Sequence, residues 1–209
     1  MRIIKITALL CSIITSVFFA SCTYYGEKRD VAFVYAIGIG EKDGKFAAYF
    51  LKSAEQNKET AQNTETNARE SVKDTKTVYL ECEKTYGKNA EEAFGEFYEK
   101  YGDVYINSAN IYIFSKDVSG ETIYGFGKYL VNSNKLPLKR DVLICEDVEG
   151  FFLNCAGSFD AKGFEKACAE TEDSGNIVHF LSAYPQKTDS FPKEAYFSDG
   201  KITIKGKDT

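Results

Sequence analysis

Two apolar runs joined by an Asp-Gly turn constrain the fold of this chain most strongly. The first run, residues 31–39, is rich in β-branched and aromatic residues, and the second covers residues 46–51. Between them lies Asp43-Gly44, a pair typical of tight hairpins because glycine adopts positive φ without strain. The sequence therefore predicts an antiparallel hairpin at the start of the folded domain.

Further along the chain, strand-like runs alternate with segments that have a helical period. Strands are predicted at residues 77–84, 109–114, 141–145 and 201–205, and helices at 89–101, 118–131, 148–155, 160–170 and 175–184. The apolar character of 109–114 indicates an interior strand, whereas 201–205 suits a sheet edge. This order predicts an α+β fold with one mixed β-sheet and helices packed on it.

Two of the predicted helices have a clear apolar face. In the helix at 89–101, apolar residues recur at helical spacing from Ala90 to Tyr101, and acidic residues occupy the other face. In the helix at 118–131, the residues expected to face inward are Ile123, Phe126 and Leu130. Both patterns predict that one side of each helix packs on the sheet.

Residues 53–76 differ sharply from their surroundings. The segment is rich in Glu, Gln, Asn, Thr and Lys and contains no aromatic residue. Such a stretch buries too little apolar surface to offset the entropy lost on ordering. We expect a mobile loop between two strands, with a binding loop as the functional alternative.

The first residues of the chain have the features of an export signal. Arg2 and Lys5 precede an uncharged apolar run over residues 6–20, which is shorter than the roughly 20 residues that span a bilayer. The run ends in Ala20-Ser21-Cys22, which resembles the lipobox of bacterial lipoproteins. The resemblance implies cleavage before Cys22 and lipid attachment to its thiol. An uncleaved membrane anchor and an ordinary signal peptide remain the alternatives.

The charge of the chain limits how it is held at a membrane. The formal net charge is −5, and removal of the two cations in residues 1–21 makes it −7. An acidic chain without a basic cluster does not favour binding to nucleic acid or to anionic headgroups. No second apolar run is long enough to span a bilayer. Attachment is therefore expected through lipid on Cys22 or through a protein partner.

Four cysteines lie in the expected domain, at positions 82, 145, 155 and 168. Cys82 and Cys145 fall in apolar strand-like runs and Cys168 in a helix-like stretch, which favours buried, reduced thiols. In an exported chain disulfides are the alternative, and four cysteines allow three pairings. The spacings do not match a zinc site.

The sequence contains no recognisable catalytic motif. A Ser-His-Asp arrangement would require His179, the single histidine, and there is no Gly-x-Ser-x-Gly elbow to supply the serine. The glycine pairs Gly38/Gly40 and Gly125/Gly127 do not continue into a phosphate-binding motif, and backbone geometry accounts for the first pair. We therefore expect a binding or assembly protein with no cofactor and no metal, and not an enzyme.

Three stretches resemble the N-terminal domain of the spore germination receptor C subunits, the Ger(x)C lipoprotein family. They are residues 30–45 after the anchor, residues 88–97, and residues 105–115 followed by 125–133. In the family these places hold an apolar strand and turn, a helix, and a buried strand followed by a helix. Order and spacing hold from Cys22 to about Ile144.

The resemblance implies a domain plan and a role. Residues 1–21 are the signal peptide, 22–30 a tether, 31–199 one α+β domain, and 200–209 a terminal strand or the start of a next domain. The implied role is that of a non-catalytic subunit on the outer face of the inner spore membrane. Its partners there are integral-membrane receptor subunits of A and B type. A stand-alone extracytoplasmic lipoprotein that binds a ligand or an envelope protein is the alternative.

Overall fold

The computed structural model describes residues 32–54, 77–102, 104–169, 176–183, 193–198 and 200–205. The predicted signal peptide and tether, and residues 55–76 of the expected mobile loop, lie outside the described residues. The helices and strands described below all belong to one compact unit that begins at Ala32.

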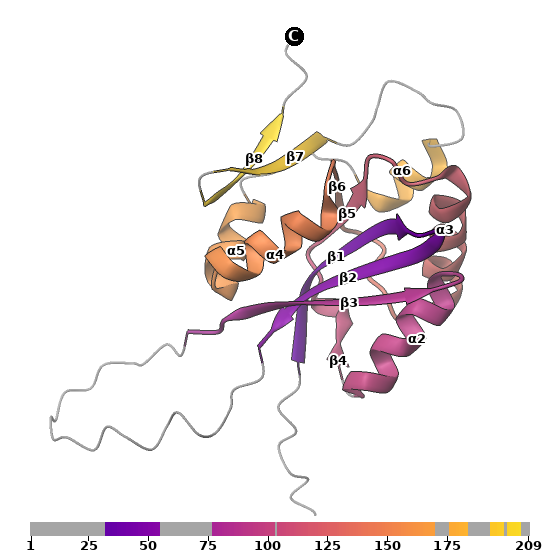
Figure 1. The fold of residues 1–209 in the computed structure, drawn as a ribbon, viewed down its shortest axis with the longest axis horizontal. Helices are drawn as coiled ribbons and strands as arrows, with labels where there is room; N and C mark the ends of the chain where they lie inside the picture. Colours follow the sequence, from indigo (N-terminus) through magenta and orange to yellow (C-terminus); the bar gives the residue numbers. More distant parts are fainter. Residues whose placement is uncertain are drawn as a thin grey trace, which may run out of the picture. The chain divides into compact units, whose positions relative to one another are not determined.

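The described chain begins with three strands, alternates between helices and strands in its middle, and ends with three helices followed by two strands (Figure 1). The strands are β1 (Ala32–Lys42), β2 (Lys45–Ser53), β3 (Leu80–Gly87), β4 (Val104–Tyr105), β5 (Ile111–Ser115), β6 (Asp141–Cys145), β7 (Lys193–Ser198) and β8 (Lys201–Lys205). The helices are α2 (Ala90–Tyr101), α3 (Gly120–Ser133), α4 (Val148–Ser158), α5 (Ala161–Ala169) and α6 (Ile177–Ala183), with a 3₁₀ turn, η2, at Ile106–Ser108.

All eight described strands belong to one mixed sheet. Its order is β3-β2-β1-β5-β6-β7-β8, and β4 pairs with the beginning of β1. Strands β1, β5, β6 and β7 run parallel, whereas the pairs at both ends of the sheet are antiparallel. The predicted α+β class with one mixed sheet is confirmed, as are the interior position of β5 and the edge position of β8.

The predicted hairpin is formed by β1 and β2. Asp43 and Gly44 have φ values of 52° and 72°, the left-handed conformation that a two-residue hairpin turn requires. Lys42 pairs directly with Lys45, so the first strand runs three residues beyond the predicted end at Ile39. The tight turn extends the pairing further than the apolar pattern indicated.

Strand β1 contains a bulge that sets which side chains face each side of the sheet. The register with β2 shifts between Val34 and Ala36. As a result Val34 lies in the same buried cluster as Ile37 and Ile39, while Ala36 lies in the cluster on the opposite face. Strict alternation would have put Val34 and Ala36 on one face.

One face of the sheet is covered by α2, α3 and α6 through an aromatic core. Phe50 of β2 stacks on Phe97 of α2, with ring centroids 3.7 Å apart and planes 13° from parallel. Phe94 of α2 contacts Phe126 of α3, and Phe180 of α6 lies against Phe114 of β5. The predicted inward residues of α3, Ile123, Phe126 and Leu130, are all buried here.

The other face is covered by α4 and α5. Phe151, Phe152 and Phe164 are buried there against the apolar residues of β1, β5 and β6. At Gly38 of β1 an added Cβ would lie 2.6 Å from Val148 and 2.9 Å from Phe152. Gly38 does not have positive φ. The expectation that backbone geometry explains this glycine is therefore wrong, because the close approach of α4 explains it.

Several element boundaries differ from prediction, and two strands were not predicted. Helix α3 begins at Gly120 because the Ser119 hydroxyl accepts a hydrogen bond from the Thr122 amide and caps it. Strand β3 lies three residues later than expected. The unpredicted strands are β4, which has two residues, and β7, which joins β8 through a turn in which Gly200 has a φ of 73°.

Replacing Gly38 by alanine tests the close contact between β1 and α4. The methyl group would overlap two buried side chains, so Gly38→Ala should lower the free energy of unfolding by about 1–3 kcal/mol. Gly157→Ala is the matched control, because a Cβ at Gly157 meets no atom of the described residues within 4 Å. Equal stability of the two variants in denaturant unfolding would contradict the packing argument.

Candidate functional site

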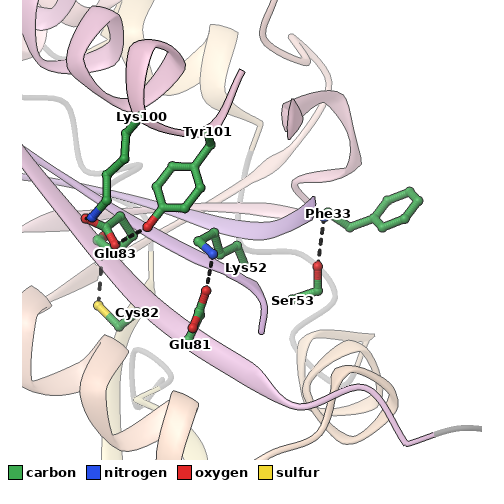
Figure 2. Close-up of polar contacts among 8 residues, drawn as sticks. All are labelled: Phe33, Lys52, Ser53, Glu81, Cys82, Glu83, Lys100 and Tyr101. Carbon is green, nitrogen blue, oxygen red and sulfur yellow. Dashed lines mark hydrogen bonds and ion pairs between the residues drawn. The ribbon is translucent and has the colours of Figure 1, made fainter. Parts of the chain in front are cut away.

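The predicted lipid-attachment residue, Cys22, lies outside the described residues. The described chain begins at Ala32 of β1, which pairs with Val104 of β4. Close by, the Ser53 hydroxyl at the end of β2 accepts a hydrogen bond of 3.0 Å from the Phe33 amide (Figure 2). These contacts fix the beginning of the domain to its sheet.

His179, the residue that a catalytic triad would require, lies on an exposed position of α6. Its backbone carbonyl accepts a hydrogen bond of 2.8 Å from the Ser182 hydroxyl of the same helix. This contact belongs to the helix and uses no atom of the imidazole ring. The structure therefore places the side chain of His179 on the exposed side of α6.

The four cysteines lie on one face of the sheet, in or against the cluster beneath α4 and α5. Cys82, Cys145 and Cys155 carry free thiols, and the last two are buried. Burial raises the pKa of Cys82 to about 11 and of Cys145 to about 12. Thiols held in the protonated form are poor nucleophiles and poor metal ligands. The positions of these three residues agree with the prediction of reduced cysteines.

A polar cluster joins β2, β3 and the end of α2 (Figure 2). Lys52 of β2 has 0 % of its surface exposed, and its ammonium group pairs with Glu81, directly opposite on β3. The Lys52 Nζ also lies 4.2 Å from the ring centroid of Tyr101. An ion pair and an aromatic face thus compensate the loss of water around this buried cation.

Glu83 is the second carboxylate of the cluster. Its oxygens accept hydrogen bonds from Lys100 Nζ, at 2.7 Å, and from the Tyr101 hydroxyl. Burial acts to raise the pKa of Glu83, but these bonds outweigh it and hold the pKa below its usual value. Burial, followed by the bond to Glu83, raises the pKa of Tyr101 to about 12.

The polar cluster closes the ends of a long connection. Strand β2 ends at Ser53 and β3 begins at Leu80, and the Ala54 amide donates a 2.9 Å hydrogen bond to the Tyr79 carbonyl. Lys52 and Glu83 each bond to a partner within the cluster. We call this cluster the polar clamp, because it links β2 and β3 at the ends of the connection between them. Its charged groups pair with one another.

An exposed apolar groove lies between α3 and α6. Its volume is about 710 Å³, and Ile123 and Leu181 contribute to its lining. Four further apolar residues of its wall are exposed: Tyr124 by 75 %, Val131 by 64 %, Val178 by 50 % and Leu138 by 44 %. Apolar side chains gathered in this way are typical of interaction surfaces.

The groove exists because α3 has a second stripe beside its buried one. Tyr124, Gly127 and Val131 recur at helical spacing on the outer side of α3. A Cβ at Gly127 would lie 3.4 Å from the Leu181 side chain, so the glycine lets α6 pack close. The buried stripe was predicted from its helical spacing, whereas the exposed stripe was not predicted, although the same spacing indicates it.

The described residues contain neither a membrane-crossing helix nor a preformed metal centre. No helix among them is both long and apolar enough to cross a membrane. Within the same residues, no group of three or more His, Cys, Asp or Glu side chains is placed to hold a metal ion. Comparison of the chain with models of known families, with curated proteins and with solved structures gives no match.

Glu83→Gln tests the polar clamp through its pH dependence. Because the pKa of Glu83 is lower in the folded chain, its ionised form stabilises the fold above the usual carboxyl pKa. That stability disappears as the pH falls through the folded-state pKa. At about pH 7 the variant should lose about 1–2 kcal/mol of unfolding free energy, and at about pH 3 little or nothing.

The control for this measurement is Glu99→Gln, an exposed position on the neighbouring helix α2. It should follow the wild-type pH profile within about 0.5 kcal/mol. A constant difference between Glu83→Gln and the wild type across the whole pH range would show that the ionised carboxylate is not what stabilises the clamp.

Proposed function

We propose that this chain is a lipid-anchored, non-catalytic subunit of a nutrient-germinant receptor and a member of the Ger(x)C lipoprotein family. The observation that carries the proposal is the Ala20-Ser21-Cys22 sequence at the end of a short apolar run. Two acyl chains on Cys22 give stable attachment, at about 0.8 kcal/mol per buried methylene. The location is the outer face of a membrane, the inner spore membrane in the family.

The three stretches that resemble the family support this proposal. They correspond to the β1 hairpin, to α2, and to β5 with α3. Strands β1 and β5 are neighbours in the sheet, and α2 and α3 cover one face of it. The resemblance therefore concerns one connected part of the domain rather than scattered segments.

The groove between α3 and α6 supports a role in protein contacts. Its described lining is mainly apolar in a chain of net charge −5, and Lys128 is the charged residue among the described residues that line it. We propose that it receives an apolar segment of an integral-membrane partner subunit, of the A or B type. None of the described residues that line the groove is a carboxylate, which suits such a partner because a buried unpaired carboxylate would oppose binding.

Lipid labelling tests the anchor. The wild-type chain, expressed in its native host with a labelled fatty acid, should carry label and sediment with membranes. Cys22→Ser should lack label and move to the soluble fraction, because its thiol acceptor is gone. A soluble, unlabelled wild-type chain would overturn the anchor and with it the membrane location.

Val131→Asp tests the groove as a partner surface. The residue is 64 % exposed, so the free energy of unfolding should change by less than about 0.5 kcal/mol. Co-purification of the integral-membrane subunits should fall at least about tenfold, because the new carboxylate is desolvated on binding. Leu153→Asp, at a 55 % exposed position of α4, is the matched control and should retain binding.

Retained co-purification in Val131→Asp would contradict the groove assignment. The receptor role itself is tested by deletion of the gene in a strain that has no compensating receptor. Unchanged nutrient-triggered germination in that strain would overturn the proposed function. These two results are independent, because a subunit can act in the receptor through a different surface.

A further inference from the structure

The charge of α3 and of the segment that follows it differs from that of the whole chain. Acidic residues outnumber basic ones by 31 to 26 overall, yet residues 122–140 contain no Asp or Glu. The cations of this stretch are Lys128, Lys135, Lys139 and Arg140. The negative net charge, from which we expected no attraction to anionic headgroups, therefore does not describe this part of the surface.

The three lysines of this stretch carry charges that no carboxylate of the described residues neutralises. Lys128, Lys135 and Lys139 are all exposed. Within the described parts of the chain, none of them takes part in an ion pair. Lys135 Nζ lies 4.5 Å from the centroid of the Tyr98 ring, a contact that leaves its charge in place. The positive charge is therefore available to an anionic partner.

Apolar side chains are exposed among these lysines. Tyr124 and Val131 of α3 are exposed by 75 % and 64 %, and Leu138 by 44 %. Tyr124, Lys128 and Val131 recur at helical spacing, which places a lysine between two exposed apolar residues on the outer side of α3. Lys128 lines both the apolar groove toward α6 and a polar cavity of about 650 Å³ toward α2, so it lies between them (Figure 1).

These residues form one surface, which we call the basic face. Its members are Tyr124, Lys128, Val131, Lys135, Leu138 and Lys139. Tyrosine is enriched at the level of lipid headgroups, and lysine lays its apolar stem along a membrane surface while its ammonium group reaches the phosphates. Exposed apolar side chains add affinity by entering the boundary between headgroups and acyl chains. The combination favours the surface of an anionic bilayer.

We propose that the basic face lies against the anionic headgroups of the membrane to which the chain is anchored. The inference rests on the lipid anchor proposed above. Residues 23–31 span at most about 35 Å, so a lipid on Cys22 keeps the domain close to the bilayer, where a weak contact is sufficient. The groove between α3 and α6 then opens at the level of the headgroups, where a segment of an integral-membrane partner leaves the bilayer.

Tryptophan fluorescence tests the contact, because the sequence contains no tryptophan. Tyr124→Trp places the sole indole on the basic face, and Leu153→Trp is the matched control at an exposed position of α4. The full-length, lipidated proteins are added to vesicles that contain about 30 % phosphatidylglycerol and phospholipids brominated near the carbonyl end of their acyl chains. Bromine quenches an indole that lies at the bilayer, so Tyr124→Trp should be quenched at least about twice as strongly as Leu153→Trp.

The charge of the lipid, the salt concentration and the three lysines should each change this quenching. Vesicles of phosphatidylcholine alone, or salt at about 0.5 M, should lower the quenching of Tyr124→Trp nearly to that of the control. Combining Lys128→Gln, Lys135→Gln and Lys139→Gln with Tyr124→Trp should do the same on anionic vesicles. The corresponding triple arginine variant keeps the charge and should keep the quenching.

A melting midpoint within about 5 °C of the Tyr124→Trp protein shows that the glutamine variant folds. If it does not fold, the comparison of anionic with neutral vesicles decides. Three outcomes would overturn the inference. They are equal quenching of Tyr124→Trp and Leu153→Trp, as expected if a protein partner rather than lipid covers this face, equal quenching of Tyr124→Trp on anionic and neutral vesicles, and unchanged quenching in the folded glutamine variant.

Flotation of the vesicles separates this inference from the anchor on which it rests. A chain that does not float with the vesicles contradicts the lipid anchor, and the inference with it. A chain that floats without the difference in quenching contradicts this inference alone. Co-purification of the receptor subunits in detergent involves no bilayer, so it tests the groove separately.

Discussion

The burial of strand β1 on both faces is the constraint on which the rest of the structure depends. Val34, Ile37 and Ile39 face α2, α3 and α6, while Ala36 and Gly38 face α4. A strand covered on both sides must find hydrogen-bonding partners along both edges, because water cannot satisfy its backbone. β1 finds them in β2 on one edge and in β4 and β5 on the other.

Because the inner sides of the helices pack against the sheet, any surface that these helices offer to another molecule lies on their outer sides. Helix α3 shows this most clearly. Its inner stripe, Ile123, Phe126 and Leu130, is buried in the core. Its outer residues line two separate features, the apolar groove toward α6 and the polar cavity toward α2. One helix fixed on the sheet thus presents two surfaces of different chemistry.

Sequence patterns predicted those parts of the fold that depend on local chemistry. The Asp43-Gly44 turn, the apolar face of α2 and the strand at Asp141–Cys145 were all predicted with their correct type. Strand β7 was missed, although Asp199-Gly200 repeats the turn signal used for the first hairpin. Its parallel pairing with β6 is a long-range contact of two residue pairs, for which the local sequence holds no signal.

The surfaces were harder to predict than the fold, for a physical reason. In the sequence alone, a glycine such as Gly95 indicates only a low helix propensity. Its structural effect arises when α2 and α3 pack together, because the missing side chain leaves room between them. Gly38 is the opposite case, because there the missing side chain is replaced by atoms of α4. Whether atoms of another element fill the space beside a glycine or leave it open therefore depends on tertiary packing.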